Sequence, residues 1–163
     1  MTNAKFYNET LGRHIDFQEL VEEIAAYMKE KPEREYKITV GTDSQGRQTT
    51  QLVTAIAIIR VGNGGRYFWT KSEEIYCPTF QDRIYKETMQ SITLVQELRS
   101  RLKDKMGEEF FWDKKISVHI DVGRQGPTKD LLETVVGMVK GYGFTAVVKP
   151  ESFGAFCLAD RHT

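Results

Sequence analysis

Two aspartates are spaced along the chain in a way that could form a divalent-metal site. Asp43 follows an apolar alternating segment in Val-Gly-Thr-Asp-Ser-Gln, and Asp121 follows another in His-Ile-Asp-Val-Gly. If both segments are neighbouring strands, the two aspartates lie about 4.8 Å apart, one strand spacing. Carboxylates at that separation repel each other unless a cation or a proton lies between them. Because Mg²⁺ and Mn²⁺ prefer oxygen ligands, the pair predicts a site for one of these ions.

Two further carboxylates could complete such a site. Glu87 lies one turn after Ile84 and one turn before Ser91 on the flank of an apolar helix stripe, so we expect it to project toward the sheet. A carboxylate placed there needs a polar partner. Asp160 is the fourth candidate, and Glu97, on the same predicted helix as Glu87, is the alternative helix carboxylate.

These acids also have ordinary structural interpretations. An aspartate at a strand end is often a turn or capping residue, and a helix glutamate is often simply solvated. These interpretations stay open for Asp43 and Glu87 taken singly. The metal-site hypothesis depends on the joint placement of all four acids.

Several polar residues could contact a substrate near these acids. Residues 123–129, Gly-Arg-Gln-Gly-Pro-Thr-Lys, join a predicted strand to a helix start, where backbone N–H groups and two cations could receive a phosphate. His162 could transfer a proton or be merely exposed, whereas His119 alternates with core residues and is predicted to be packed. Trp69 is predicted to be a core or sheet-surface residue rather than a base-stacking platform. The predicted substrate-binding residues are Ser44, Gln45, Arg124, Lys129, Lys149 and His162.

The elements that position these residues follow from the hydrophobic periodicity. The expected strands are residues 36–43, 52–61, 66–75, 115–121 and 144–148. The expected helices are residues 16–31, 80–103, 127–141 and 152–161. Three meandering strands followed by alternating units predict an α/β fold with a five-stranded mixed sheet, spatial order 3-2-1-4-5, and helices on both faces. The first and fourth strands are neighbours where the strand order switches, which is where open α/β sheets place their sites.

Three motifs carry a resemblance to a known family. They are Ile-Thr-Val-Gly-Thr-Asp-Ser-Gln at 38–45, His-Ile-Asp-Val-Gly-Arg-Gln-Gly at 119–126, and Lys-Pro-Glu-Ser with Ala-Asp-Arg-His between 149 and 162. In these motifs the chain resembles the YkuK family of bacterial ribonuclease H-like proteins over nearly its whole length. The resemblance implies a ribonuclease H-like fold over residues 36–163, with residues 1–35 as an N-terminal helical extension packed on that domain. By position it implies the site acids Asp43, Glu87, Asp121 and Asp160.

Composition narrows the class of protein. The 163 residues suit one domain. Lys plus Arg and Asp plus Glu both number 23, which counts against a protein that coats nucleic acid non-specifically. Cys77 and Cys157 lack the spacing of a disulfide framework or a zinc site. The first ten residues contain no apolar run, and no segment is long and apolar enough to span a bilayer, so we expect a cytoplasmic protein without a membrane partner.

These observations lead to three hypotheses for function. The first is a metal-dependent nuclease acting on RNA or DNA/RNA structures, in which Asp43 and Asp121 bridge two Mg²⁺ or Mn²⁺ ions while Glu87 and Asp160 complete their shells. One ion would activate water and the other would stabilise the leaving oxygen. The second is a catalytically inactive ribonuclease H-like module that binds nucleic acid or a protein partner. The third is a phosphate-handling enzyme that acts on nucleotides through residues 123–129.

Overall fold

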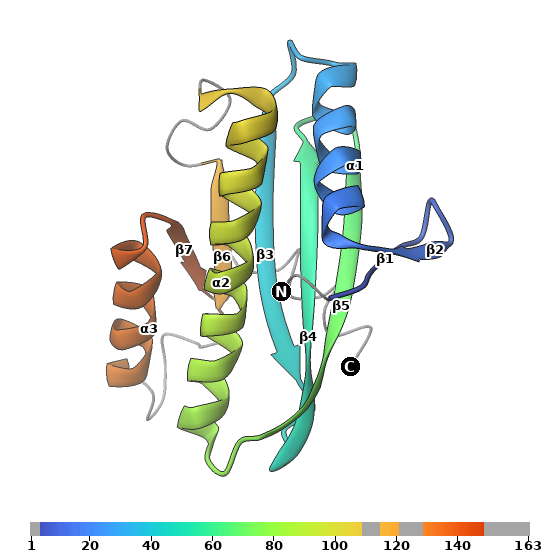
Figure 1. Ribbon diagram of the computed structural model, residues 1–163. Coiled ribbons are helices and arrows are strands. Elements are labelled where there is room, and N and C mark those ends of the chain that lie inside the picture. Colours follow the sequence, from blue (N-terminus) through green and yellow to red (C-terminus); the bar gives the residue numbers. More distant parts are fainter. Residues whose placement is uncertain (1–3, 109–114, 121–128, 149–163) are drawn as a thin grey trace.

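The central element is a mixed sheet whose longest strands run along the length of the molecule (Figure 1). A computed structural model of the chain describes residues 4–108, 115–120 and 129–148. The sheet has seven strands in the order β2-β1-β5-β4-β3-β6-β7. Their bounds are β1 Phe6–Asn8, β2 Arg13–Ile15, β3 Tyr36–Ser44, β4 Thr49–Arg60, β5 Gly65–Tyr76, β6 Ile116–Ile120 and β7 Thr145–Val148.

The predicted arrangement of five strands is confirmed within this sheet. The strands β5-β4-β3-β6-β7 lie in the expected order 3-2-1-4-5. The β3–β4 and β4–β5 pairs are antiparallel, and the β3–β6 and β6–β7 pairs are parallel. The carboxyl ends of β3 and β6 therefore lie side by side at one end of the sheet.

The predicted strand number was wrong, because β1 and β2 extend the sheet beyond β5. Each has only three residues, too few for alternation to be visible in the sequence. Side chains attach this ribbon: Asn8 Nδ2 donates to the Tyr67 carbonyl at 2.9 Å, and Thr70 Oγ1 donates to the Lys5 carbonyl at 2.7 Å. The resulting sheet has seven strands instead of five.

Three described helices pack side by side on one face of the sheet (Figure 1). They are α1 Phe17–Glu30, α2 Phe80–Met106 and α3 Lys129–Gly141. Asp16 and Thr79 cap the first two, because their side-chain oxygens accept hydrogen bonds from the backbone N–H groups of Glu19 and Asp82. One hydrophobic core unites buried side chains of all three helices with residues of β3, β4, β5, β6 and β7. The predicted last helix, residues 152–161, lies outside the described residues.

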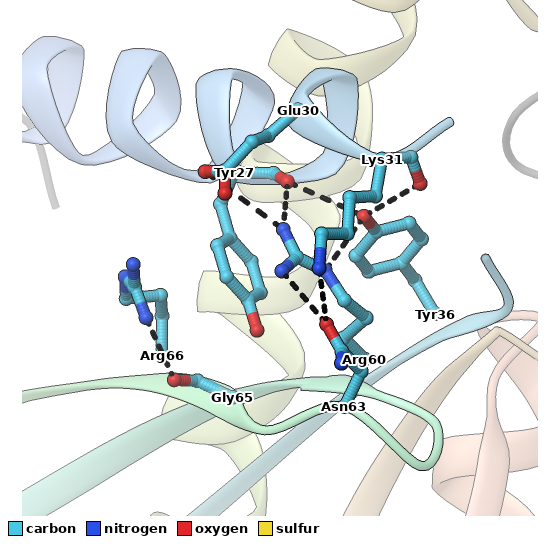
Figure 2. A network of polar contacts seen from close by, with 8 residues as sticks. All are labelled: Tyr27, Glu30, Lys31, Tyr36, Arg60, Asn63, Gly65 and Arg66. Atoms are coloured by element: carbon cyan, nitrogen blue, oxygen red, sulfur yellow. Dashed lines mark hydrogen bonds and ion pairs between the residues drawn. The ribbon is translucent and has the colours of Figure 1, made fainter. Parts of the chain in front are cut away.

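A buried arginine fastens α1 to the sheet (Figure 2). The Arg60 guanidinium donates from Nη2 to the Tyr27 carbonyl at 2.8 Å and from Nε to the Tyr36 hydroxyl at 3.0 Å. That hydroxyl donates to the Lys31 carbonyl at 2.8 Å. The guanidinium also lies 4.0 Å from the centre of the Tyr27 ring. These bonds satisfy carbonyl groups at the end of α1 that have no partner within the helix.

Candidate active site

Asp43 lies at the carboxyl end of β3, next to the end of β6. It is the second-last residue of β3 and is 8% exposed. The parallel pairing of the two strands runs as far as Gly41 opposite His119. Strand β6 then ends at Ile120, the residue before Asp121 in the sequence. The structure therefore places Asp43 at the predicted end of the sheet, where the strand order switches.

Glu87 reaches the same end of β3 from α2. Ser44 Oγ donates a hydrogen bond to Glu87 Oε1 at 2.6 Å. Arg83 Nε lies 4.0 Å from the same oxygen. Glu87 is 6% exposed, and it lines a closely packed crevice with His119 and Ile120 of β6. The Ser44 hydroxyl, predicted to contact a substrate, thus contacts the helix carboxylate in this structure.

A chain of buried hydroxyls sets the position of α2 along β3. Thr42 Oγ1 lies 3.0 Å from Thr54 Oγ1 and 2.7 Å from Ser91 Oγ. Four helix residues advance about 6 Å and two strand residues about 6.6 Å. The contacts of Thr42 with Ser91 and of Ser44 with Glu87 therefore fit one register, with α2 antiparallel to β3.

This register separates the two candidate helix carboxylates. Glu87 lies at the carboxyl end of β3, whereas Glu97 lies ten residues later, about 15 Å farther along α2. Glu97 Oε2 is buried and has no hydrogen-bond partner among the described residues. Of the two acids, only Glu87 is placed near the end of β3.

Asp43 and Glu87 lie on different sides of the sheet. Thr42 and Ser44 both contact α2, so the Asp43 side chain between them faces the side opposite the helices. Within residues 4–108, 115–120 and 129–148, no group of three or more His, Cys, Asp or Glu side chains is placed to bind a metal ion. The described residues thus supply two separate carboxylates at one end of the sheet.

The other predicted site residues divide into two groups. Gln45 follows β3 and is exposed, and Lys129 begins α3 and is also exposed. The remaining predicted site residues lie outside the described residues: Asp121, Arg124, Lys149, Asp160 and His162.

His119 is packed, as the sequence predicts. It is 9% exposed, and burial lowers the pKa of its imidazole. Its Nδ1 atom has no hydrogen-bond partner in the described part of the chain. The imidazole is therefore favoured in its neutral form.

Sequence reasoning missed the polar residues that position Glu87. Arg83 precedes Glu87 by four residues, a spacing that brings side chains together on a helix. The contact between Arg83 and Glu87 could therefore have been predicted from the sequence. The contact between Ser44 and Glu87 depends on the register of α2 along β3, and the local sequence around either residue does not predict that register.

The donor chemistry of the described acids fits a hard divalent cation. Asp43 and Glu87 both offer carboxylate oxygens, which Mg²⁺ and Mn²⁺ prefer. Both residues are buried, and a buried carboxylate requires charge or hydrogen-bond compensation. The Ser44 bond to Glu87 is the kind of outer contact that orients a metal-ligating carboxylate.

In the described part of the chain, no helix is both long and apolar enough to cross a membrane. No solved structure matches the chain. Among curated proteins, the chain is similar to the uncharacterized protein YkuK of Bacillus subtilis (strain 168). The two are 32% identical over 169 aligned positions, which cover 97% of this chain and 96% of the relative.

The family comparison agrees with the fold. The chain has a mixed sheet, a parallel β3–β6 pair and a buried aspartate at the end of β3. A family model described as "Ribonuclease H-like" matches residues 19–163. With these matches the chain belongs to the ribonuclease H-like family and is a YkuK-like member of it.

Proposed function

We propose that this protein is a metal-dependent nuclease that hydrolyses phosphodiester bonds in RNA or DNA/RNA structures. The observation that carries the proposal is the buried Asp43 at the end of β3, beside the end of the parallel strand β6. Family membership supports it, because the ribonuclease H-like family suggests a nuclease or a nucleic-acid-binding module.

In this proposal four acids would hold Mg²⁺ or Mn²⁺: Asp43, Glu87, Asp121 and Asp160. Asp43 and Glu87 approach the end of β3 from opposite faces, so the metal would lie beyond that end of the sheet, where both can reach it. The bound metal would activate water for attack on phosphorus and stabilise the leaving oxygen. The chain's own contribution is orientation. Ser44 fixes one carboxylate oxygen of Glu87, and Arg83 places a positive charge beside it.

The test is hydrolysis of labelled single-stranded RNA, single-stranded DNA and RNA/DNA hybrid in the presence of Mn²⁺. The Asp43→Asn variant keeps the size of the side chain and removes its charge. We expect it to lose activity by more than about 100-fold. Mutating a residue that only orients a metal ligand already costs up to about 100-fold, and Asp43 is proposed to be a ligand itself. Asp104→Asn, at an exposed position on α2, is the matched control and should retain full activity. Equal hydrolysis by wild type and Asp43→Asn would refute the proposal.

The alternative is a catalytically inactive module that keeps the fold and binds nucleic acid or a protein. The family match supports it as well, because the ribonuclease H-like family suggests a nuclease or a nucleic-acid-binding module. It predicts binding of oligonucleotides by wild type without cleavage of any of the three substrates.

A further inference from the structure

A polar pocket opens on the face of the sheet opposite the helices, between the β3–β4 turn and β5. Its volume is about 180 Å³, and its lining includes Gln45, Arg47, Gln51, Val53, Lys71 and Glu74. A water molecule occupies about 30 Å³ in the liquid, so the pocket has room for a phosphate group. Of these lining residues, Gln45 alone was predicted from the sequence to contact a substrate.

Strand register connects the pocket to Asp43. Asp43 pairs with Val53 of β4, and Val53 pairs with Lys71 of β5. Side chains of directly paired residues lie on the same face of a sheet. Asp43 and the pocket therefore share one face, and Lys71 lies two strand spacings from Asp43, about 9.6 Å.

The charge of the pocket suits an anion. Arg47 and Lys71 contribute two positive charges and Glu74 one negative charge. Within the described part of the chain, Arg47 and Lys71 form no ion pair with a carboxylate, and both are exposed. Guanidinium and ammonium groups are the usual protein ligands of phosphate. Gln45 adds an amide that can donate further hydrogen bonds.

Aromatic side chains continue from the pocket to the edge of the sheet. Lys71 Nζ lies 5.8 Å from the centre of the Trp69 ring. The Trp69 and Tyr7 ring centres are 5.5 Å apart, and those of Tyr7 and His14 are 5.2 Å apart. These three rings form an aromatic row across β5, β1 and β2, because each is the cross-strand partner of the next. His14, at the end of the row, is exposed.

A cationic pocket beside a row of rings is the combination that single-stranded nucleic acid requires. Positive side chains contact its backbone, and its unpaired bases stack on aromatic rings without regard to sequence. A duplex hides the faces of its bases and would use only the cations. The aromatic row therefore favours a single strand over a duplex.

We propose that the polar pocket and the aromatic row form a binding track for single-stranded RNA or DNA. Arg47 and Lys71 contact a phosphate in the pocket, and a base stacks against the aromatic row at His14. The inference rests on the proposed nuclease function, since a strand on this track passes the face that carries Asp43. It names the substrate as a single strand at this point, and it places substrate contacts in the β3–β4 turn, on β5 and on β2.

The track is tested by binding alone, with metal removed. The full chain is titrated with a fluorescently labelled oligothymidylate in EDTA, and the anisotropy is measured over a series of salt concentrations. The variant is Arg47→Gln/Lys71→Met. The matched control is Arg34→Gln/Lys29→Met, which removes the same charge from exposed positions on and just after α1.

We expect the track variant to bind about tenfold or more weakly than the control. The slope of log K against log salt should decrease by about 0.7 for each lost phosphate contact. His14→Ala should weaken binding at least about fivefold, the lower end of the range for a stacked base, with its salt slope unchanged. Circular dichroism and thermal melting check that each variant folds.

Equal affinity of the track and control variants would overturn the proposal, as would tighter binding of duplex than of single strand. Because no metal is present, these outcomes are independent of hydrolysis. If Asp43→Asn abolishes cleavage while the track variant binds normally, the nuclease function stands and the track is wrong. If wild type binds through the track but cleaves nothing, the track stands and the nuclease function fails.

Discussion

Ser44 links the two described acids, because it follows Asp43 in the strand and donates its hydroxyl proton to Glu87. Hydrogen bonds to buried polar groups are costly to break when one partner is left behind. Ser44→Ala removes the hydroxyl and leaves the buried carboxylate in place.

We therefore expect Ser44→Ala to lower the free energy of unfolding by about 1–3 kcal/mol. Urea denaturation followed by circular dichroism measures this. Ser100→Ala, at an exposed position on α2, removes the same group and should change stability by no more than a few tenths of a kcal/mol, as is usual for surface substitutions. If both variants have the same free energy of unfolding, the Ser44–Glu87 hydrogen bond does not stabilise the fold.

Cys77 gives a prediction about pH. It is 4% exposed, and burial raises the pKa of its thiol by more than the nearby charge of Lys86 lowers it. A raised pKa means less thiolate at any given pH, and the thiolate is the form that reacts with disulfide reagents.

In a Cys157→Ser background, Cys77 is the only cysteine. Its reaction rate in the native protein should keep rising with pH above the ordinary thiol pKa of about 8.5, where the rate in urea levels off. Stopped-flow measurement with an aromatic disulfide reagent gives both profiles. A native profile that levels off at or below the denatured one would contradict the assignment.

At the residue scale, sequence patterns could place Asp43 but not its surroundings. Alternation ends at Asp43, so its position at a strand end follows from the sequence. Its face follows only from the contacts of Thr42 and Ser44 with α2. The choice between Glu87 and Glu97 also required the register of α2 against β3, since both lie on one predicted helix.

At the scale of elements, α1 is joined to the sheet by the Tyr36 hydroxyl (Figure 2). That hydroxyl accepts from Arg60 and donates to the carbonyl of Lys31, the residue after α1. Tyr36→Phe deletes the hydroxyl and leaves both partners in a buried site.

Tyr36→Phe should therefore cost about 1–3 kcal/mol of unfolding free energy, by the same reasoning as for any buried, broken hydrogen bond. The control is Tyr67→Phe, because Tyr67 is 47% exposed. Thermal melting of the two variants compares them directly. A Tyr36→Phe protein as stable as the control would mean that the Arg60 network does not fasten α1.

The sequence predicted long elements better than short ones. Five strands and four helices were expected. The five strands and the three helices that fall on described residues have boundaries within a few residues of those expected, because each carries several turns or alternations. Strands β1 and β2 were missed, since β1 meets β5 through the single pair Tyr7 and Trp69. Side-chain bonds from Asn8 and Thr70 complete that edge, and such bonds have no periodic signature.

At the scale of the whole molecule, the two faces of the sheet have different roles. The helix face carries the hydrophobic core, to which α1 contributes Phe17, Leu20 and Ile24. The N-terminal segment is therefore part of the same core as the ribonuclease H-like elements. The opposite face carries Asp43, the polar pocket and the aromatic row, so Asp43 and the proposed binding track share one face.

We propose that Asp43, at the end of β3, and Asp121, which follows β6 in the sequence, bind a divalent cation in the folded protein. A ligand that binds only the folded state stabilises it, by about 2.7 kcal/mol at 100 times its dissociation constant. In a domain of this size each kcal/mol raises Tm by about 2–4 °C.

The most direct measurement is thermal melting of wild type, Asp43→Asn and Asp104→Asn with and without Mn²⁺. We predict that Mn²⁺ raises Tm by about 5–10 °C in wild type and Asp104→Asn, and leaves Tm of Asp43→Asn unchanged. No rise in wild type, or an equal rise in wild type and Asp43→Asn, would contradict the claim.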